Sequence, residues 1–222
     1  MKESKEKELL FLVIIFIIIF DVSFIFSNIR STIFYSVLIG ITIICLGAIF
    51  HIIVQERIKK EKEIETLLYY DKVTKLPNKN KFLNDIPKTI KNKEKYAVIV
   101  FDMRDFKELL DDIGLTEVNK FLKNIASIIK KETKSNELCS NISDDHFALL
   151  YEYKKESDLE DRIKSINKQI KEYDIKQKIT LSFGIYPITD KRFSSTLMFN
   201  KASLARKEIV DKKNILFNFY KN

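Results

Sequence analysis

The feature that most constrains this chain is a pair of long apolar runs near its N-terminus. Residues 9–26 contain one charged side chain, Asp21, and residues 33–54 contain no Asp, Glu, Lys or Arg. A hydrocarbon core about 30 Å thick is spanned by roughly 20 helical residues, and neither run has the polar stripe of a helix in a soluble core. The sequence therefore predicts two transmembrane helices, at about residues 9–26 and 33–54, that form a hairpin anchor over residues 1–54.

Basic residues flank the two runs unevenly. They lie before the first run and after the second, whereas the short loop between the runs holds only Arg30 (Lys2, Lys5 and Lys7; then Arg57, Lys59, Lys60 and Lys62). The positive-inside rule then places both termini in the cytoplasm. We expect a multi-pass protein of the inner (cytoplasmic) membrane, with the lipid bilayer as a partner and the C-terminal part cytoplasmic. A cleaved signal peptide is the alternative for the first run.

Asp21 and residues 55–70, which follow the second run, each allow two interpretations. Asp21 either faces the second helix, a ligand or a pore, or lies near the outer interface where water reaches it. Residues 55–70 are rich in helix formers and lack Gly and Pro, which predicts a helical linker. That linker either transmits motion and dimerises or is a plain spacer.

The net charge of +8 is confined to the C-terminal part of the chain. Positive and negative side chains balance within residues 1–54 and again within residues 55–70, so the excess lies in residues 71–222. A basic surface attracts anionic ligands, anionic lipid or nucleic acid. Because this part is predicted to lie beneath an anionic inner leaflet, attraction to the membrane accounts for the charge, and we expect no nucleic-acid partner.

Cysteine and histidine are too few to build a scaffold or a zinc site. The chain has two of each, Cys45 and Cys139, and His51 and His146. The cysteines lie far apart in contrasting surroundings, which excludes a disulfide framework, and the histidines leave no room for a His-rich metal site.

From residue 71 onward, helical and strand patterns alternate. Apolar side chains at helical spacing predict helices, and β-branched runs bounded by turn residues predict strands. The expected helices cover residues 78–92, 106–113, 116–132, 157–173 and 195–210, and the expected strands cover residues 96–101, 137–142, 146–153, 178–186 and 215–220. This order predicts an α/β or α+β domain over residues 71–222, with an antiparallel hairpin at its centre.

Two acidic features coincide with these elements. Asp102 ends the first expected strand, and Asp144 and Asp145 lie at the tip of the expected hairpin. Carboxylates from a strand end and an adjacent hairpin hold Mg²⁺ against a triphosphate in palm-type nucleotidyl-transfer domains. The alternative is that these acidic residues are simply good turn formers.

Four segments of this part resemble the motifs of GGDEF domains, the diguanylate cyclase family. Residues 71–82 (DKVTKLPNKNKF) resemble the opening signature D-x-L-T-G-L-P-N-R-x-x-F, and residues 101–114 (FDMRDFKELLDDIG) resemble the strand-plus-helix motif. Residues 142–150 contain SDDHF where the name-giving hairpin falls, and residues 179–187 resemble the V-T-x-S-x-G strand. The resemblance implies a GGDEF or palm-like domain with a central mixed sheet and surrounding helices. It also implies a reaction, in which a dimer joins two GTP molecules into cyclic di-GMP with Mg²⁺.

Part of the machinery that the resemblance implies is present. The family's metal ligands fall on Asp102, the carbonyl of Met103 and Asp145, so Mg²⁺ is expected through Asp102 and Asp145 and no other cofactor is expected. The family's phosphate contacts fall on Phe106 and Lys107.

Other family positions are altered. The two guanine-reading positions carry Leu110 and Asn119, and a site that reads a base through polar groups loses discrimination when one becomes apolar. The two hairpin glycines are replaced by Ser143 and by Asp144, whose charge opposes a triphosphate, and the hairpin Glu is replaced by His146. Further departures are Arg104 for the second Asp of the strand motif, Asn141 for the Arg before the hairpin, and Ile209 or Val210 near the position of a phosphate-binding Lys. The R-x-x-D inhibitory site falls on Lys134 and Glu137, as a candidate remnant.

Three hypotheses follow from this pattern. The first is a catalytically silent GGDEF domain on a membrane hairpin, which acts through a guanine nucleotide or cyclic di-GMP, through homodimerisation or through a partner protein. The second is an active diguanylate cyclase with an unusual hairpin. The third is another metal-dependent nucleotide enzyme, because Asp102, Asp145 and Lys107 remain. Four altered site elements, each worth on the order of 10²-fold in rate, favour the first hypothesis.

Overall fold

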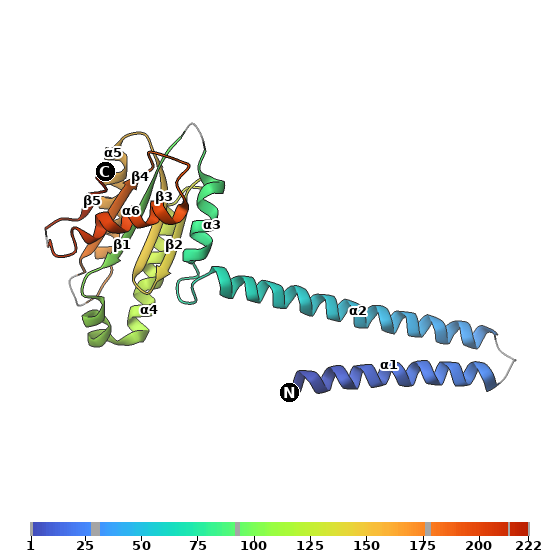
Figure 1. The fold of residues 1–222 in the computed structure, drawn as a ribbon. Coiled ribbons are helices and arrows are strands. Elements are labelled where there is room, and N and C mark those ends of the chain that lie inside the picture. Colours follow the sequence, from blue (N-terminus) through green and yellow to red (C-terminus); the bar gives the residue numbers. More distant parts are fainter. Residues whose placement is uncertain (1, 28–31, 92–93, 176–178, 213, 222) are drawn as a thin grey trace. The chain divides into compact units, whose positions relative to one another are not determined.

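The computed structural model describes residues 2–27, 32–91, 94–175, 179–212 and 214–221 (Figure 1). The chain forms two compact units, Met1–Glu63 and Ile64–Asn222. The predicted division into an anchor, a linker and a C-terminal domain, at residues 54/55 and 70/71, stays a prediction.

The first unit contains α1 (Lys2–Ser27) and most of α2 (Thr32–Tyr69). The Tyr35 hydroxyl of α2 donates a hydrogen bond to the Phe24 carbonyl of α1 at 3.0 Å, and the two rings lie 5.5 Å apart. Among the described residues, one helical stretch, Phe34–Tyr69, is long and apolar enough to cross a membrane, and Phe11–Phe24 is a shorter apolar stretch. The protein therefore has an N-terminal apolar helix that is a candidate membrane span. Most of the predicted loop between the two runs, residues 28–31, lies outside the described residues.

The second unit is built on a five-stranded sheet in the order β2-β3-β1-β4-β5. The strands are β1 (Lys95–Met103), β2 (Leu138–Ser143), β3 (His146–Tyr153), β4 (Leu181–Pro187) and β5 (Phe217–Phe219). Neighbouring strands are antiparallel except for β4 and β5, so the sheet is mixed, as expected. The predicted hairpin, β2–β3, lies at one edge of the sheet and not at its centre, because β4 and β5 extend the sheet on the other side of β1 (Figure 1).

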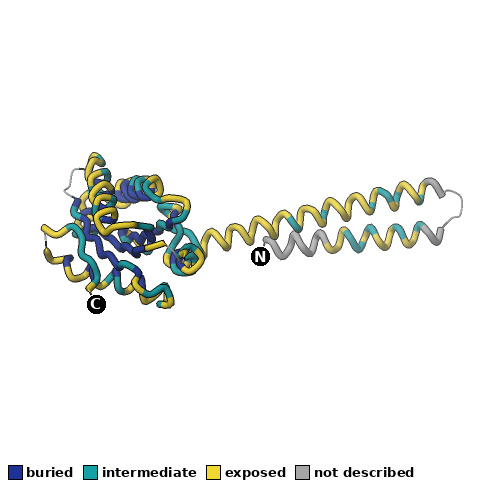
Figure 2. The backbone as a smooth tube through the Cα atoms, turned by 90° about the horizontal axis from the view of Figure 1, so that it is seen from above, coloured by how far each residue is buried: buried dark blue, intermediate teal, exposed yellow. Residues whose placement is uncertain are grey.

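Helices cover both faces of this sheet. They are α3 (Lys79–Thr89), α4 (Phe106–Glu132), α5 (Glu156–Lys171) and α6 (Ser195–Lys207). Ile99 and Phe101 of β1 belong to a buried cluster with the apolar faces of α4 and α5, whereas Val98 and Val100 belong to a second cluster with α3 and α6. Since successive side chains of a strand point to opposite faces, β1 supplies both cores. Figure 2 shows the buried residues gathered on the strands and on the sheet-facing sides of the helices.

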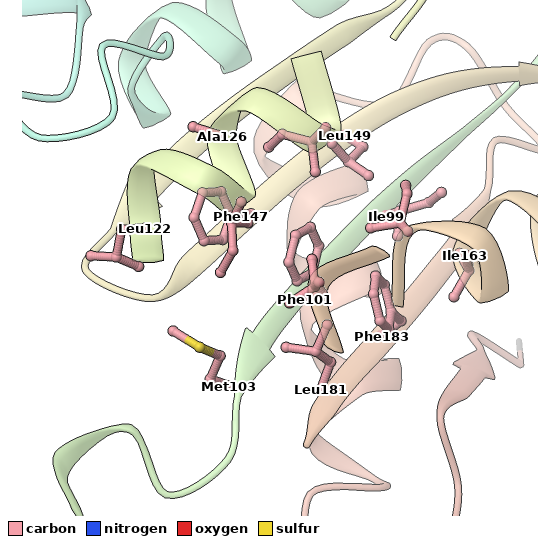
Figure 3. Close-up of a cluster of buried hydrophobic side chains, with 14 of the residues drawn as sticks. Ile99, Phe101, Met103, Leu122, Ala126, Phe147, Leu149, Ile163, Leu181 and Phe183 are labelled. Atoms are coloured by element: carbon pink, nitrogen blue, oxygen red, sulfur yellow. The ribbon is translucent and has the colours of Figure 1, made fainter. Parts of the chain in front are cut away.

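A stack of three phenylalanines crosses the middle of the sheet on the α4/α5 face. Phe101 of β1 lies opposite Phe147 of β3 and Phe183 of β4, with ring centroids 5.1 Å and 4.7 Å apart. Figure 3 shows the three rings among the apolar side chains of this cluster. Stacked rings of this kind add about 0.5–1.5 kcal/mol per pair beyond the burial of their surface. The stack therefore fixes the register of β1 directly beside Asp102.

The order and type of the predicted elements are confirmed. The two helices expected at residues 106–113 and 116–132 are joined as α4, which breaks at Gly114, where φ is 78° and ψ is 162°. The other elements lie within three residues of their predicted bounds. Residue 92, the predicted end of the helix expected from residue 78, and residue 178, the predicted start of the fourth strand, lie outside the described residues.

The opening signature folds into a tight turn before α3. The Asp71 carboxylate accepts hydrogen bonds from the Thr74 amide and hydroxyl, both at 2.6 Å, and the Pro77 carbonyl accepts one from the Asn141 amide of β2 at 3.0 Å. Lys75 lies where the family pattern has Gly, and its φ of 59° is in the left-handed region. This signature is thus a structural turn that joins α3 to the edge of the sheet.

Candidate functional site

The site begins with the face of the sheet on which Asp102 lies. Asp102 follows Val98 and Val100 at a two-residue spacing, so its side chain points to the face covered by α6. Its register partner on β4 is Ser182, which is fully buried. Asp102 itself is 9% exposed, so its carboxylate needs a partner within the protein.

That partner is Arg206 of α6. Gly184 of β4 allows α6 to approach closely, since a Cβ at this position would lie 2.1 Å from the Ala202 carbonyl oxygen and 2.7 Å from the Arg206 Cβ. Arg206 is 8% exposed, and its guanidinium Nη1 donates a hydrogen bond to Asp102 Oδ2. The end of β1 and the C-terminal half of α6 are therefore joined by a buried ion pair.

The second carboxylate comes from the turn between β2 and β3. Asp144 has a φ of 39°, a left-handed conformation that Asp tolerates better than most residues, and its carbonyl accepts a hydrogen bond from the Asn141 side chain at 2.9 Å. Asp145 is 5% exposed, and its Oδ2 accepts a hydrogen bond from the Met103 amide at 3.0 Å. This turn brings Asp145 next to Asp102. Ser143 and Asp144 are exposed.

His146 bridges the two carboxylates. Its Nε2 lies 3.4 Å from Asp102 Oδ2, and its Nδ1 lies 3.1 Å from Asp145 Oδ1. The Asp145 carboxylate raises the pKa of His146 above its ordinary value against the effect of partial burial, and Asp102 contributes in the same direction. Burial raises the pKa of the Asp102 carboxyl, and the charge and hydrogen bond of Arg206 oppose this shift.

Asp102, Asp145 and His146 form a group that could hold a metal ion, since one ligand atom from each lies within 4.8 Å of the others. The arrangement does not fit Mg²⁺. Mg²⁺ prefers an octahedral set of oxygen ligands, whereas here the imidazole of His146 lies against both carboxylates. In addition, Oδ2 of Asp102 already accepts a hydrogen bond from a buried cation. Asp102 is thus paired with Arg206, and Asp145 accepts a hydrogen bond from the Met103 amide.

The positions that correspond to nucleotide contacts lie on and around α4. Asp105, with a φ of 58°, turns the chain from β1 into this helix. Lys107 is exposed, whereas Phe106 and Leu110 are half-buried and pack against the main apolar cluster. Asn119 is half-buried, beyond the break at Gly114. Leu110 thus packs on the core, at the position to which the resemblance assigns guanine reading.

Arg104 holds the segment that follows α6. Its Nε donates to Ser182 Oγ at 2.6 Å, and its Nη2 donates to the carbonyls of Ile209 and Ile215 at 2.9 Å and 3.0 Å. Two arginines, Arg104 and Arg206, therefore fasten the C-terminal helix and loop to the end of the central strands.

The candidate inhibitory residues lie apart from this centre. Lys134 is exposed, whereas the Glu137 side chain is fully buried and its Oε2 accepts a hydrogen bond from the Lys134 amide at 2.8 Å. Arg162 of α5 donates to both carboxylate oxygens of Glu137, at 2.6 Å and 2.8 Å, and stacks on the Tyr151 ring at 3.6 Å. Glu137 is thus engaged in a buried structural network.

Arg206 and Arg162 were not predicted from the sequence as partners of buried carboxylates. A signal for Arg206 was present, since it continues the apolar series of Met198 and Ala202 at four-residue spacing. A charged side chain on the buried stripe of a helix implies a buried counter-ion. The identity of that counter-ion could not be read from the sequence.

A sheet whose central strand ends in a carboxylate, beside a second carboxylate on the adjacent hairpin, defines a palm-like class of domain. Within that class, the chain belongs to the GGDEF-domain family of diguanylate cyclases, whose family model matches residues 68–213. This membership places it in the protein family of cyclic di-GMP signalling.

Relatives and solved structures agree with this assignment. The chain is 24% identical over 152 residues to the bifunctional diguanylate cyclase/cyclic di-GMP phosphodiesterase MucR of Pseudomonas aeruginosa, a match that covers 64% of this chain and 22% of that protein. The fold is similar to the coiled coil and GGDEF domain of DgcB from Caulobacter crescentus in complex with c-di-GMP, with a TM-score of 0.70, 15% identity and coverage of 80% of this chain and 99% of that one. It is also similar to the diguanylate cyclase SiaD of Pseudomonas aeruginosa in complex with its activator SiaC, with a TM-score of 0.59, 16% identity and coverage of 98% and 87%.

Proposed function

We propose that this protein is a membrane-anchored GGDEF-domain protein that does not synthesise cyclic di-GMP and acts instead by binding a ligand or a partner. The observation that carries the proposal is the buried hydrogen bond between Arg206 and Asp102. The family's reaction needs the strand-end carboxylate as a metal ligand, and in this chain that carboxylate already has a buried cation as its partner.

Three further features support a silent site. His146 replaces the hairpin carboxylate and lies between Asp102 and Asp145. Asp144 places a negative charge at the hairpin turn, where it opposes the approach of a triphosphate. Leu110 packs on the core and offers no polar atom to a base. Each change affects a different element of the family's catalysis, and the loss of one element alone is enough to lower the rate strongly.

The test is an incubation of the full chain, purified in lipid nanodiscs, with GTP and either Mg²⁺ or Mn²⁺. The expected result is no cyclic di-GMP by mass spectrometry. Cyclic di-GMP formed by the wild type and lost in Asp102→Asn would overturn the proposal and establish the second candidate, an active cyclase, which the adjacency of Asp102 and Asp145 favours. The same incubation with ATP, CTP or UTP tests the third candidate, another nucleotide enzyme.

The ligand or partner through which the protein is proposed to act is a nucleotide or another protein. The DgcB structure contains c-di-GMP and the SiaD structure contains an activator protein, which supports a nucleotide and a protein as the classes to test for this chain. Calorimetry of the full chain with cyclic di-GMP, GTP and ATP separates these classes. Heat with a guanine nucleotide supports a nucleotide-binding role, and no heat with any of the three favours a protein partner. Light scattering of the same sample measures homodimerisation.

The membrane anchor is proposed to be a two-span hairpin with both termini cytoplasmic. The contact of Tyr35 with the Phe24 carbonyl supports it, because aromatic side chains are enriched at membrane interfaces and this contact ties the two helices together near the loop. The test is cysteine labelling in intact cells with a membrane-impermeant maleimide, in a background without Cys45. Asn28→Cys is expected to react and Ser4→Cys is expected not to react. Labelling of Ser4→Cys would place the N-terminus outside.

A further inference from the structure

The site contains a cation of its own, Arg206, although the resemblance to the family implies a metal there. Arg206 belongs to α6, and its guanidinium reaches the end of β1 because Gly184 lets the helix lie against β4. A buried guanidinium is stable only where a carboxylate or carbonyl oxygens satisfy its charge, and Asp102 supplies the carboxylate. The ion pair therefore depends on both partners.

The position of the Arg206 guanidinium bears directly on metal binding. It binds Oδ2 of Asp102, the same oxygen that lies 3.4 Å from His146 Nε2. A divalent cation coordinated by this carboxylate would lie within a few ångströms of the guanidinium. Two cations at that separation in a buried site repel each other strongly. Arg206 and a metal ion are thus alternatives for the same carboxylate.

The second carboxylate is satisfied without a metal as well. Asp145 accepts the Met103 amide at 3.0 Å and lies 3.1 Å from the imidazole of His146. Arg104, at the strand-motif position where the family has an acidic residue, turns away to bind Ser182 and the carbonyls of residues 209 and 215. The strand end therefore has one acidic group fewer than the family's strand motif, and it has a buried cation on its first carboxylate.

We propose that Arg206 is the permanent counter-ion of this carboxylate centre, in the place that the family gives to Mg²⁺, so that the folded chain excludes divalent cations from Asp102 and Asp145 and uses the ion pair to fasten α6 to β1. The inference deepens the proposed function and concerns the same site. It is tested by metal binding and not by catalysis, so the two can fail separately.

The experiment uses the full chain in lipid nanodiscs and Mn²⁺ as the probe, with bound Mn²⁺ measured by the loss of the free-ion electron paramagnetic resonance signal. We expect no binding to the wild type that depends on Asp102, and no change in its melting temperature on adding Mn²⁺. In Arg206→Met, the carboxylates lose their counter-ion, and Mn²⁺ affinity is expected to rise by about tenfold or more, with a rise in melting temperature on adding Mn²⁺. The double variant Arg206→Met/Asp102→Asn is expected to lose this binding.

Arg192→Met is the matched control, because Arg192 is an exposed arginine paired with Asp190 at 2.8 Å. It is expected to behave as the wild type. Stoichiometric Mn²⁺ binding by the wild type that Asp102→Asn abolishes overturns the inference, even if no cyclic di-GMP is made, in which case the proposed function survives. A folded Arg206→Met that gains no Mn²⁺ binding also overturns it. If Arg206→Met does not fold, Arg206→Lys is used instead, because it retains the positive charge. Mn²⁺ binding that depends on Asp102, in this variant or in the wild type, overturns the inference. The absence of such binding in both proteins supports it.

Discussion

The guanidinium of Arg206 donates a hydrogen bond to the carboxylate of Asp102, and the two residues are 104 positions apart in the chain. This buried pair connects α6 to the end of the central strand at the position where the family resemblance implies a metal ion. It gives the domain a structural use for a carboxylate that the family uses in catalysis. Variants of this pair therefore test both the stability of the second unit and the chemistry of the carboxylate site.

Asp102→Asn is expected to lower the free energy of unfolding by about 3 kcal/mol, because it leaves a buried guanidinium without its carboxylate. The control is Asp190→Asn, which breaks an exposed pair with Arg192 and is expected to cost less than about 1 kcal/mol. Denaturant unfolding followed by a probe in the second unit measures both. Equal losses in the two variants would show that the buried pair adds no more stability than the exposed pair.

His146 is expected to titrate above its ordinary pKa of 6.5 because the carboxylates of Asp145 and Asp102 stabilise its charged form. Since the folded state then binds the proton more tightly than the unfolded state, the stability contributed by His146 is fully present below pH of about 6.5 and is lost as the pH rises through the folded-state pKa. Imidazole resonances in NMR measure this pKa, and Asp145→Asn is expected to lower it. A value at or below 6.5 in the wild type contradicts the contacts described here.

Lys75→Gly is expected to raise the free energy of unfolding by about 0.5–1 kcal/mol. Lys75 has a φ of 59° in the opening turn, a conformation that is strained for a residue with a Cβ and that Gly adopts freely. The control is Lys72→Gly in the same turn, where φ is not positive and Gly only adds freedom to the unfolded chain. Stabilisation by both variants, or by neither, is inconsistent with strain at Lys75.

Gly184→Ala is expected to destabilise the second unit by about 3 kcal/mol, because the new Cβ would lie 2.1 Å from the backbone carbonyl of Ala202 and would push α6 off the sheet. The comparison is Gly114→Ala, which has open space but a φ of 78°, so only backbone strain of about 1 kcal/mol is expected. Because α6 carries Arg206, Gly184→Ala is also expected to weaken the ion pair. Thermal unfolding that ranks Gly114→Ala as the more damaging variant contradicts this account.

Glu137→Gln is expected to cost about 3 kcal/mol of stability and to leave any binding of cyclic di-GMP unchanged. The Glu137 carboxylate is buried and paired with Arg162, so it serves the packing of α5 and not a ligand. Lys134→Ala, on the exposed partner position, is expected to change neither quantity. Calorimetry with cyclic di-GMP measures the binding, and denaturant unfolding measures the stability of both variants. A loss of cyclic di-GMP binding in either variant would support an inhibitory site at these positions.

Much of the second unit could be predicted from local patterns. The break in α4 at Gly114 and the turn at Asp144 and Asp145 could be predicted from the sequence, because glycine and acidic turn residues favour particular conformations of their own backbone. The place of the β2–β3 hairpin in the sheet could not be predicted from the sequence, because strand order depends on which strands pair across long stretches of chain. The half-buried position of Leu110 followed only from the packing of α4 on the sheet.

The order of helices and strands and the two apolar runs could be predicted because periodicity and turn chemistry are local properties of the chain. The approach of Asp145 to Asp102 could be expected only from the motifs that resemble the family, because it depends on the long-range pairing of β1 with β3. The pairing of Arg206 with Asp102 and of Arg162 with Glu137 came only from the tertiary structure. Those pairs depend on the face of the sheet that each helix covers and on the close approach that Gly184 permits. A buried charge must find a counter-ion, but which one it finds is decided by packing.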